Sequence, residues 1–248
     1  MGLPASADVG YLARMIIALR SAVEDHLQTS ISSAGITTMH LTALYPEDVR
    51  DACEYAGLEY LSFPVWYEML YETSTAYAGY GHGLCEKYME KEGCRKEQED
   101  MESEVVMAVL FTPSVLTVSL SVVKSAYYVF EPAYRHHSDF ELGYNSTRRQ
   151  QGEQGYWSAV TSELEAIMGS NLYYPRPAKV LLMGDGVVAE EFQSALQLAL
   201  KNQTEVLPDI LSRDAVFTAA KGAAEMTRRL PWDPYKNSHH RPASDLKI

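Results

Sequence analysis

The sequence predicts an α/β fold in which mixed sheets are flanked by helices, and three observations lead to this prediction. Residues 9–27 carry apolar side chains at helical spacing, which is typical of an amphipathic helix packed on a larger body. Residues 105–130 hold short apolar runs close together, as an antiparallel meander would. Residues 179–229 alternate strand-like and helix-like segments.

Composition sets the broad class of the protein. The chain has 248 residues, of which 46% are hydrophobic and 22% charged, enough for one large domain or two small ones. Its net charge of −12 disfavours nucleic acid and anionic membranes as partners, because both require clustered cations. It shows neither an apolar run of membrane-spanning length nor a signal-peptide pattern. We therefore expect an intracellular protein, cytoplasmic or nuclear.

Cysteine and histidine usage gives no metal site. Cys53, Cys85 and Cys94 are sparse and odd in number, which fits a reducing compartment better than a disulfide framework. His82 lies close to Cys85 and Cys94 in sequence, but the spacing lacks the two ligand pairs of a zinc site. No bound metal is predicted.

The first third of the chain predicts short strands between helices. Residues 36–44 are short and β-branched, as in a strand, and Pro46 then opens a helix that closes at Gly57. Residues 58–63 predict a second strand, and 65–80 a long helix.

The middle of the chain changes character twice. Residues 86–104 are almost all charged and predict an exposed linker or hairpin. The strands of the meander are then expected at 105–111, 115–123 and 126–130. Polar residues 145–155 predict a loop.

The last third supplies the α/β alternation. We expect a helix at 158–168, a strand at 179–183, a helix at 189–200, a strand at 204–207, a helix at 214–229 and a flexible tail at 231–248.

Several segments resemble a known family when they are read together. "LTALYPEDVRDACEYAGLEYL", "YETSTAYAGYGHGL", "VLLMGDGVVAEEFQSAL" and "DAVFTAAKGAAEMTRR" follow one another in the order of the nucleotide-binding domain of the seventy-kilodalton heat-shock (DnaK-type) chaperones. That domain belongs to the actin-like ATPase superfamily, whose lobes are ribonuclease H-like. The resemblance covers residues 8–230, and the order of the segments carries it rather than any single motif.

The resemblance implies two actin-like lobes. The first, 1–85, would be incomplete, because the family's first phosphate hairpin does not precede the opening helix here. Residues 86–104 would link it to the second lobe, 105–230. The nucleotide-capping subdomain would be reduced, because few residues separate Gly143, in a Leu-Gly-Tyr turn, from Gly184.

The second phosphate hairpin of the family reads D-L-G-G-G-T-F-D-V-S, and residues 110–119 take its place here. Leu110 stands for the first acid, and Thr112, Pro113 and Ser114 stand for the glycines. Glycines let backbone N–H groups approach phosphate closely, and proline has no N–H to offer. The hairpin therefore persists without its phosphate chemistry.

The adenosine turn has changed as well. The family's G-G-x-S-R reads Gly184-Asp185-Gly186-Val187-Val188, so a carboxylate that would repel a nucleotide occupies the second glycine position. A G-x-G pair is also common in plain turns after strands. Glu72 matches the acid of the family's connecting segment, either as a relic of a magnesium or water site or as an acid favoured at a helix N-terminus.

These features predict a degenerate chaperone-like ATPase domain that acts as a non-catalytic protein-binding or scaffold module. The relics of nucleotide binding would be Thr112, Ser114, Gly143, Gly184, Asp185 and Gly186, with no cofactor bound. Its partner would be another protein or a second copy of the chain. One alternative is an ATPase that binds ATP with magnesium and is completed by another segment or subunit. Another is an unrelated α/β protein with a different small-molecule site.

Overall fold

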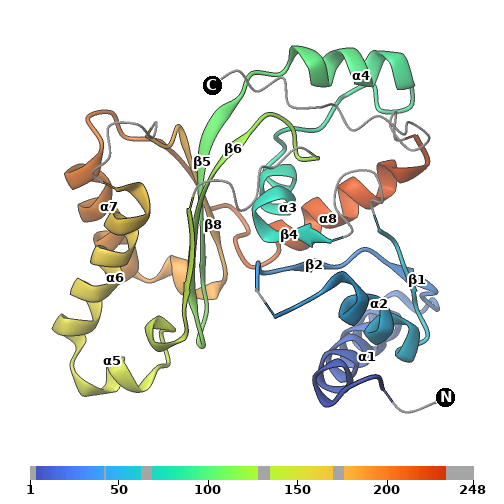
Figure 1. The fold of residues 1–248 in the computed structure, drawn as a ribbon, viewed down its shortest axis with the longest axis horizontal. Coiled ribbons are helices and arrows are strands. Elements are labelled where there is room, and N and C mark those ends of the chain that lie inside the picture. The colour runs from blue at the N-terminus through green and yellow to red at the C-terminus, as the bar shows by residue number, and fades with distance from the viewer. Residues whose placement is uncertain (1–3, 42, 63–68, 128–134, 170–175, 233–248) are drawn as a thin grey trace.

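The computed structural model describes residues 4–41, 43–62, 69–127, 135–169 and 176–232 and consists of two lobes side by side. The larger lobe contains the main sheet with α6 (Glu153–Met168) and α7 (Glu190–Gln203), and the smaller one contains α1 (Ala7–Leu27) and α2 (Pro46–Tyr55) (Figure 1). The fold is mixed α/β, as the sequence predicts.

The larger lobe is built on a mixed, five-stranded sheet with the order β7-β6-β5-β8-β9. Strands β5, β8 and β9 are parallel, whereas β6 runs antiparallel to both of its neighbours. The strands are β5 (Glu104–Phe111), β6 (Leu116–Val123), β7 (Arg135–Asp139), β8 (Lys179–Met183) and β9 (Asp209–Leu211).

Helices cover both faces of this sheet because its central strands are apolar on both sides. On one face, α6 (Glu153–Met168) and α7 (Glu190–Gln203) form a core with alternate β5 residues such as Val109 and Phe111. On the other face, α3 (Glu72–Gly79) and α8 (Thr218–Arg229) pack against the intervening residues such as Ala108. The short helical segments α5 (Thr147–Gln151), η1 (Phe140–Leu142), η2 (Asp185–Val188) and η3 (Leu230–Trp232) lie in the connections.

Two glycines allow α3 and α8 to cross in close contact. A Cβ added at Gly222 would lie 2.7 Å from the backbone nitrogen of Gly79 and closer still to the carbonyl of Thr75. A Cβ at Gly79 would meet the backbone of Thr218 in the same way. Gly222 of the "KGAAEM" segment is therefore required by helix packing.

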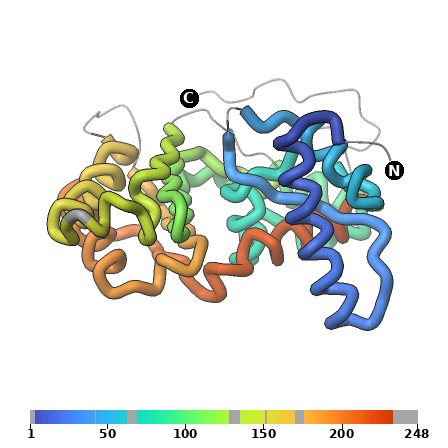
Figure 2. The backbone as a smooth tube through the Cα atoms, turned by 90° about the horizontal axis from the view of Figure 1, so that it is seen from below, coloured from blue at the N-terminus to red at the C-terminus, as the bar shows by residue number. Residues whose placement is uncertain are grey.

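The smaller lobe contains two helices and two short parallel strand pairs. Helix α1 (Ala7–Leu27) packs on α2 (Pro46–Tyr55) through a separate core that includes Val9, Ala13 and Cys53. The pairs are β1 (Ser33–Ala34) with β3 (Glu59–Tyr60), and β2 (Thr37–Thr38) with β4 (Leu70–Tyr71). Seen from below, α1 lies along the surface of this lobe (Figure 2).

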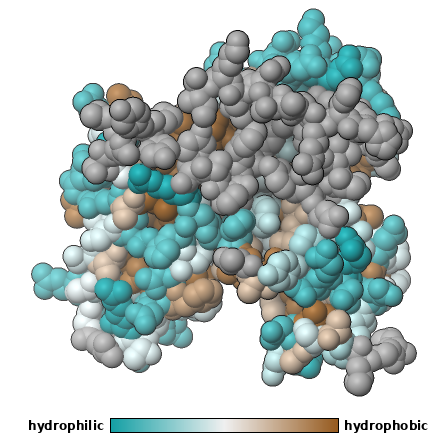
Figure 3. All heavy atoms as spheres, in the orientation of Figure 1, coloured by the Kyte–Doolittle hydropathy of each residue, from teal (hydrophilic) through white to brown (hydrophobic). Residues whose placement is uncertain are grey.

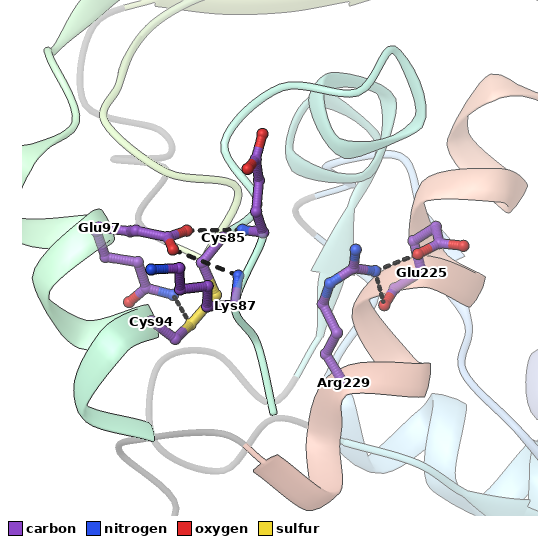
Figure 4. Close-up of a disulfide and its surroundings, with 8 residues drawn as sticks. Cys85, Lys87, Cys94, Glu97, Glu225 and Arg229 are labelled. Atoms are coloured by element: carbon purple, nitrogen blue, oxygen red, sulfur yellow. Dashed lines mark hydrogen bonds and ion pairs between the residues drawn. A yellow bond between two sulfur atoms is a disulfide. The ribbon is translucent and has the colours of Figure 1, made fainter. Parts of the chain in front are cut away.

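The charged segment at 86–104 is not a simple linker or hairpin. It contains α4 (Lys91–Asp100), of which only Cys94 and Gln98 are buried. A disulfide joins Cys94 to Cys85, and the Glu97 carboxylate accepts hydrogen bonds from the backbone N–H groups of Glu86 and Lys87 (Figure 4). The expectation that the cysteines form no disulfide is therefore wrong, although Cys53 is free and buried.

Several element boundaries in the smaller lobe differ from the prediction. The strand expected at 36–44 is limited to β2, and the long helix expected at 65–80 begins only at Glu72. Leu70 and Tyr71 precede that helix as a strand, because they pair with Thr37 and Thr38. Residues 65–68 and position 63 of the predicted 58–63 strand lie outside the described residues.

Boundaries in the larger lobe also differ. The third strand of the meander is β7 rather than 126–130, of which 128–130 lie outside the described part. The last strand is β9 rather than 204–207, and α8 begins at Thr218, since Asp214 has a positive φ of 56°. The predicted 145–155 loop contains α5 and the start of α6, because Ser146 caps α5 by accepting from the N–H of Arg149. Most of the predicted tail, 233–248, is outside the described residues.

Candidate functional site

The hairpin between β5 and β6 forms the centre of the candidate site, at the lower end of the sheet in Figure 1. Its turn is closed internally: the N–H of Thr112 donates to the carbonyl of Val115 at 3.0 Å. The N–H of Val115 in turn donates to Oγ1 of Thr112 at 3.2 Å. Both amides are therefore used within the turn, and Pro113 has no amide to offer a ligand.

The Leu142-Gly143-Tyr144 turn lies directly on this hairpin. The N–H of Tyr144 donates to the carbonyl of Thr112 at 3.1 Å, and that of Asn145 donates to the carbonyl of Pro113 at 3.0 Å. A Cβ added at Gly143 would lie 2.6 Å from the amide nitrogen of Val115 and closer still to Ser114. Gly143 therefore allows two backbones to touch, which is a packing role.

The glycines after β8 are also filled by neighbouring groups. Gly184 has a φ of 89°, and a Cβ there would meet the backbone of Phe111. A Cβ at Gly186 would lie 2.6 Å from the ring of Phe111 and 2.7 Å from the ring of Tyr144. Neither glycine therefore leaves open space for a ligand.

Asp185 forms a hydrogen bond across the same region. The phenol of Tyr144 donates to Oδ2 of Asp185 at 2.8 Å, and this bond is the main cause of a raised pKa of the Tyr144 phenol. The hydrogen bond joins the Leu142-Gly143-Tyr144 turn to η2. The six predicted relics, including Thr112, Ser114 and Asp185, therefore come together around the hairpin, held by contacts among themselves and with Phe111 and Tyr144.

A cleft of about 830 Å³ opens beside this cluster. Its lining comes from the hairpin turn, η1 and the start of α5: Pro113, Ser114, Phe140, Glu141, Asn145, Ser146, Thr147 and Arg148. Of the predicted relics, Ser114 is the one that lines the cleft. The polar residues 145–155 predict only a loop, although Ser146, three residues before Arg149, is a typical helix-capping pattern. Figure 3 shows a notch between the lower ends of the two lobes, whereas the residues that line the cleft all belong to the larger lobe.

Glu72 does not belong to this cluster. It is 6% exposed and is the first residue of α3, so its acid lies at the positive end of the helix dipole. The next residue, Thr73, shares a hydrogen bond of 3.0 Å with Ser119 of β6. Ser119 pairs with Ala108, three positions before the end of β5 at Phe111, so the start of α3 lies along the face of the sheet rather than at the turn.

Two histidines meet where the lobes join, a contact that no sequence pattern predicted. The rings of His40 and His136 are 5.0 Å apart, and the ring of His40 is 4.9 Å from that of Tyr71. Burial, followed by repulsion from His40 and His137, lowers the pKa of His136 to about 4. His136 is therefore neutral at physiological pH.

Among the residues that the structure describes, no group of three or more His, Cys, Asp or Glu side chains is arranged to hold a metal ion. In the same part of the chain, no helix combines the length and apolar character needed to cross a bilayer. The groups around the hairpin are hydroxyls, backbone amides and the carboxylates of Asp185, which accepts a hydrogen bond from Tyr144, and of Glu141, which lines the cleft. They can bind a polar ligand in the cleft, but they do not form a nucleophile-base pair.

Comparison with protein-family models gives no match, and comparison with curated proteins gives no relative.

Proposed function

We propose that this chain is a degenerate actin-like ATPase domain, resembling the nucleotide-binding domain of the seventy-kilodalton heat-shock chaperones, that acts as a non-catalytic protein-binding or scaffold module. The order of elements supports the proposal. A hairpin, a Leu-Gly turn, helix α6, strand β8, a glycine turn and helix α7 follow one another as the resemblance implies.

One observation supports the proposal that the domain is not catalytic: protein groups already occupy the positions that would face phosphate. Gly143 and Gly184 are packed against the backbone of the hairpin and its strand, and the Asp185 carboxylate is bonded to Tyr144. A phosphate group needs free N–H donors and a positive local charge. Here Pro113 supplies no donor, and the nearby acid opposes an anion.

A binding role is supported by a complete main sheet combined with a site that lacks free donors for phosphate. The main sheet keeps both of its helix layers and an extensive core, so the domain does not need nucleotide to fill its interior. The smaller lobe leaves apolar side chains of α1 at the surface, including Met15 and Leu19. Exposed apolar faces of this kind are commonly covered by a protein partner.

The alternative, an ATPase completed by another segment or subunit, is favoured by the open cleft beside the hairpin. Ser114 and Thr147 offer hydroxyls there, and Arg148 offers a positive charge to an anion. In this reading ATP with magnesium would be the ligand. Glu72 would act on water or the metal, although its place along the face of the sheet, away from the turn, speaks against that role.

An ATP turnover assay tests the proposal. We expect phosphate release by the full chain with Mg-ATP to equal the rate of a no-protein blank. Turnover above the blank that Glu72→Gln abolishes would establish the alternative. Glu72→Gln is isosteric, and its circular dichroism and melting must match the wild type for the comparison to count.

A further inference from the structure

Helix α1 carries an apolar stripe that no described element covers. Residues Tyr11, Met15, Leu19 and Val23 follow at four-residue intervals and so share one face of the helix, with Ala18 and Ala22 between them. Tyr11, Met15 and Leu19 are 64%, 62% and 65% exposed. We call this set the α1 stripe.

Tyr11, Met15 and Leu19 lie away from the face that α1 uses to fold, whereas Val23, seven residues after Ile16, lies at the edge of that face. Val9, Ala13 and Ile16 point into the core of the smaller lobe, and Arg20 donates to the carbonyl of Ala56 at 3.0 Å. The helix is thus already anchored on one side, and Figure 2 shows its position at the surface of the lobe. A helix that is apolar on two sides is expected to be covered on both.

Charges beside the stripe indicate what covers it. Arg14 and Asp25 are exposed and lie eleven residues apart, about three turns, so they flank the stripe on the same side. The guanidinium of Arg14 is stacked 4.4 Å from the ring centre of Tyr11, at the edge of the stripe. One end of this flank is therefore positive and the other negative.

We infer that a second copy of this chain packs on the α1 stripe, with the two α1 helices antiparallel about a two-fold axis near Leu19. In that arrangement Arg14 of one copy lies level with the Glu24–Asp25 turn of the other, and this contact occurs twice. In a parallel arrangement, each charged residue would lie beside the same residue of the other copy, and the like charges would repel each other. The self-complementary charge pattern thus selects the antiparallel pair.

A membrane surface fits the stripe less well. Helices that lie on anionic bilayers carry an excess of Lys and Arg on the polar face. Helix α1 instead carries Asp8, Glu24 and Asp25 against Arg14 and Arg20, and Arg20 is engaged with Glu24 and the α2 end. The whole chain has a net charge of −12.

A helix of this length spans about 31 Å, so a single helix pair gives an interface at the small end of the specific range. We therefore expect a dimer with a dissociation constant on the order of 10 µM rather than a permanent assembly. The inference names the partner of the proposed binding role. Its functional significance rests on the proposed function, whereas the geometry of the dimer is derived from helix α1 alone.

Sedimentation equilibrium of the full chain between about 1 and about 200 µM tests this inference. The average mass should rise from 27.8 kDa toward twice that value. Leu19→Glu should stay monomeric throughout. The matched control is Leu198→Glu, which changes a leucine of α7 that is 52% exposed and should dimerise like the wild type.

Charge variants test the orientation. Arg14→Glu and Asp25→Arg should each weaken the dimer by about tenfold, because both symmetric contacts become repulsive. An equimolar mixture of the two variants should regain wild-type affinity, since every contact is then between opposite charges. The double variant Arg14→Glu/Asp25→Arg should do the same.

A wild-type chain that stays at 27.8 kDa at every concentration overturns the inference. So does a dimer that survives Leu19→Glu, or charge variants that the mixture does not rescue. A monomer that neither binds nor hydrolyses ATP would leave the proposed function intact with a different partner. A dimer that hydrolyses ATP would overturn the proposed function and leave this inference intact.

Discussion

At the scale of one residue, the packing around Gly143 distinguishes a structural role from a role in nucleotide binding. Its φ of −60° suits any residue, so only the close backbone of the hairpin turn opposes a side chain there. We expect Gly143→Ala to lower the free energy of unfolding by about 1–3 kcal/mol. Urea unfolding followed by circular dichroism measures this change.

Gly155→Ala is the matched control for that substitution. Gly155 lies in α6, and an added Cβ would meet nothing within 4 Å. Its replacement should raise the free energy of unfolding by up to about 1 kcal/mol, because alanine favours the helix. Equal effects of the two substitutions would show that the hairpin contact at Gly143 is not tight.

His136 gives the molecule a pH dependence between about pH 6.5 and 4. Its folded pKa of about 4 lies below the ordinary value of 6.5, so at acidic pH the unfolded chain binds a proton that the folded chain does not. Stability should therefore fall as pH drops below 6.5 and level off below pH 4. Because the ring is partly exposed, we expect a loss of only about 1 kcal/mol at pH 5.

Urea titrations of the wild type and His136→Gln at pH 7 and pH 5 measure this effect. The variant should lose less stability on acidification than the wild type. The stability of the variant should still decrease slightly on acidification, because burial also lowers the pKa of His82. If the free energy of unfolding falls equally between pH 7 and pH 5 in the wild type and in His136→Gln, then His136 takes up its proton normally in the folded chain.

At the scale of elements, α4 depends on the disulfide more than on its own sequence. Only Cys94 and Gln98 are buried in it, while Cys85 on the preceding segment is 1% exposed. On the neighbouring helix α8, the guanidinium of Arg229 donates a hydrogen bond to the carbonyl of Glu225 (Figure 4). A disulfide that closes a loop of this length contributes about 2–3 kcal/mol.

Reduction of Cys85–Cys94 should therefore open α4 to proteolysis. With a loss of about 2 kcal/mol, the open population rises about thirtyfold, and trypsin should cleave after Arg95 and Lys96 correspondingly faster. Cleavage after Lys201 in α7, which packs on the other face of the sheet, provides an internal control and should change little. Equal rates for oxidised and reduced protein at Arg95 would show that other contacts hold α4.

For the molecule as a whole, the apolar pattern predicted the parts of the fold that are buried on a regular period. Strands β5, β6 and β8 and helix α7 are such elements, and they form most of the core. Strand β7 was missed because "RHHSD" has no apolar alternation. It is an edge strand, fixed by pairing with β6, and polar sequences are common at sheet edges.

The candidate site was predictable in part. The hairpin and the two glycine turns could be found along the chain, and the structure brings them together. Their packing against Phe111 and Tyr144 could not, because it depends on tertiary contacts between β5, η2 and the Leu142-Gly143-Tyr144 turn. Helix α4 was missed for a similar reason, since its charged sequence contains no apolar stripe and a cross-link at the buried Cys94 holds it.

A melting scan with and without millimolar Mg-ATP tests the central claim most directly. A nucleotide at a hundred times its dissociation constant would stabilise the chain by about 2.7 kcal/mol, or roughly 5–10 °C for a chain of this size. We predict no shift for the wild type, because Asp185, Pro113 and the packed glycines oppose phosphate. A shift in Asp185→Gly alone would assign the barrier to that carboxylate, whereas a clear upward shift of the wild type would contradict the account.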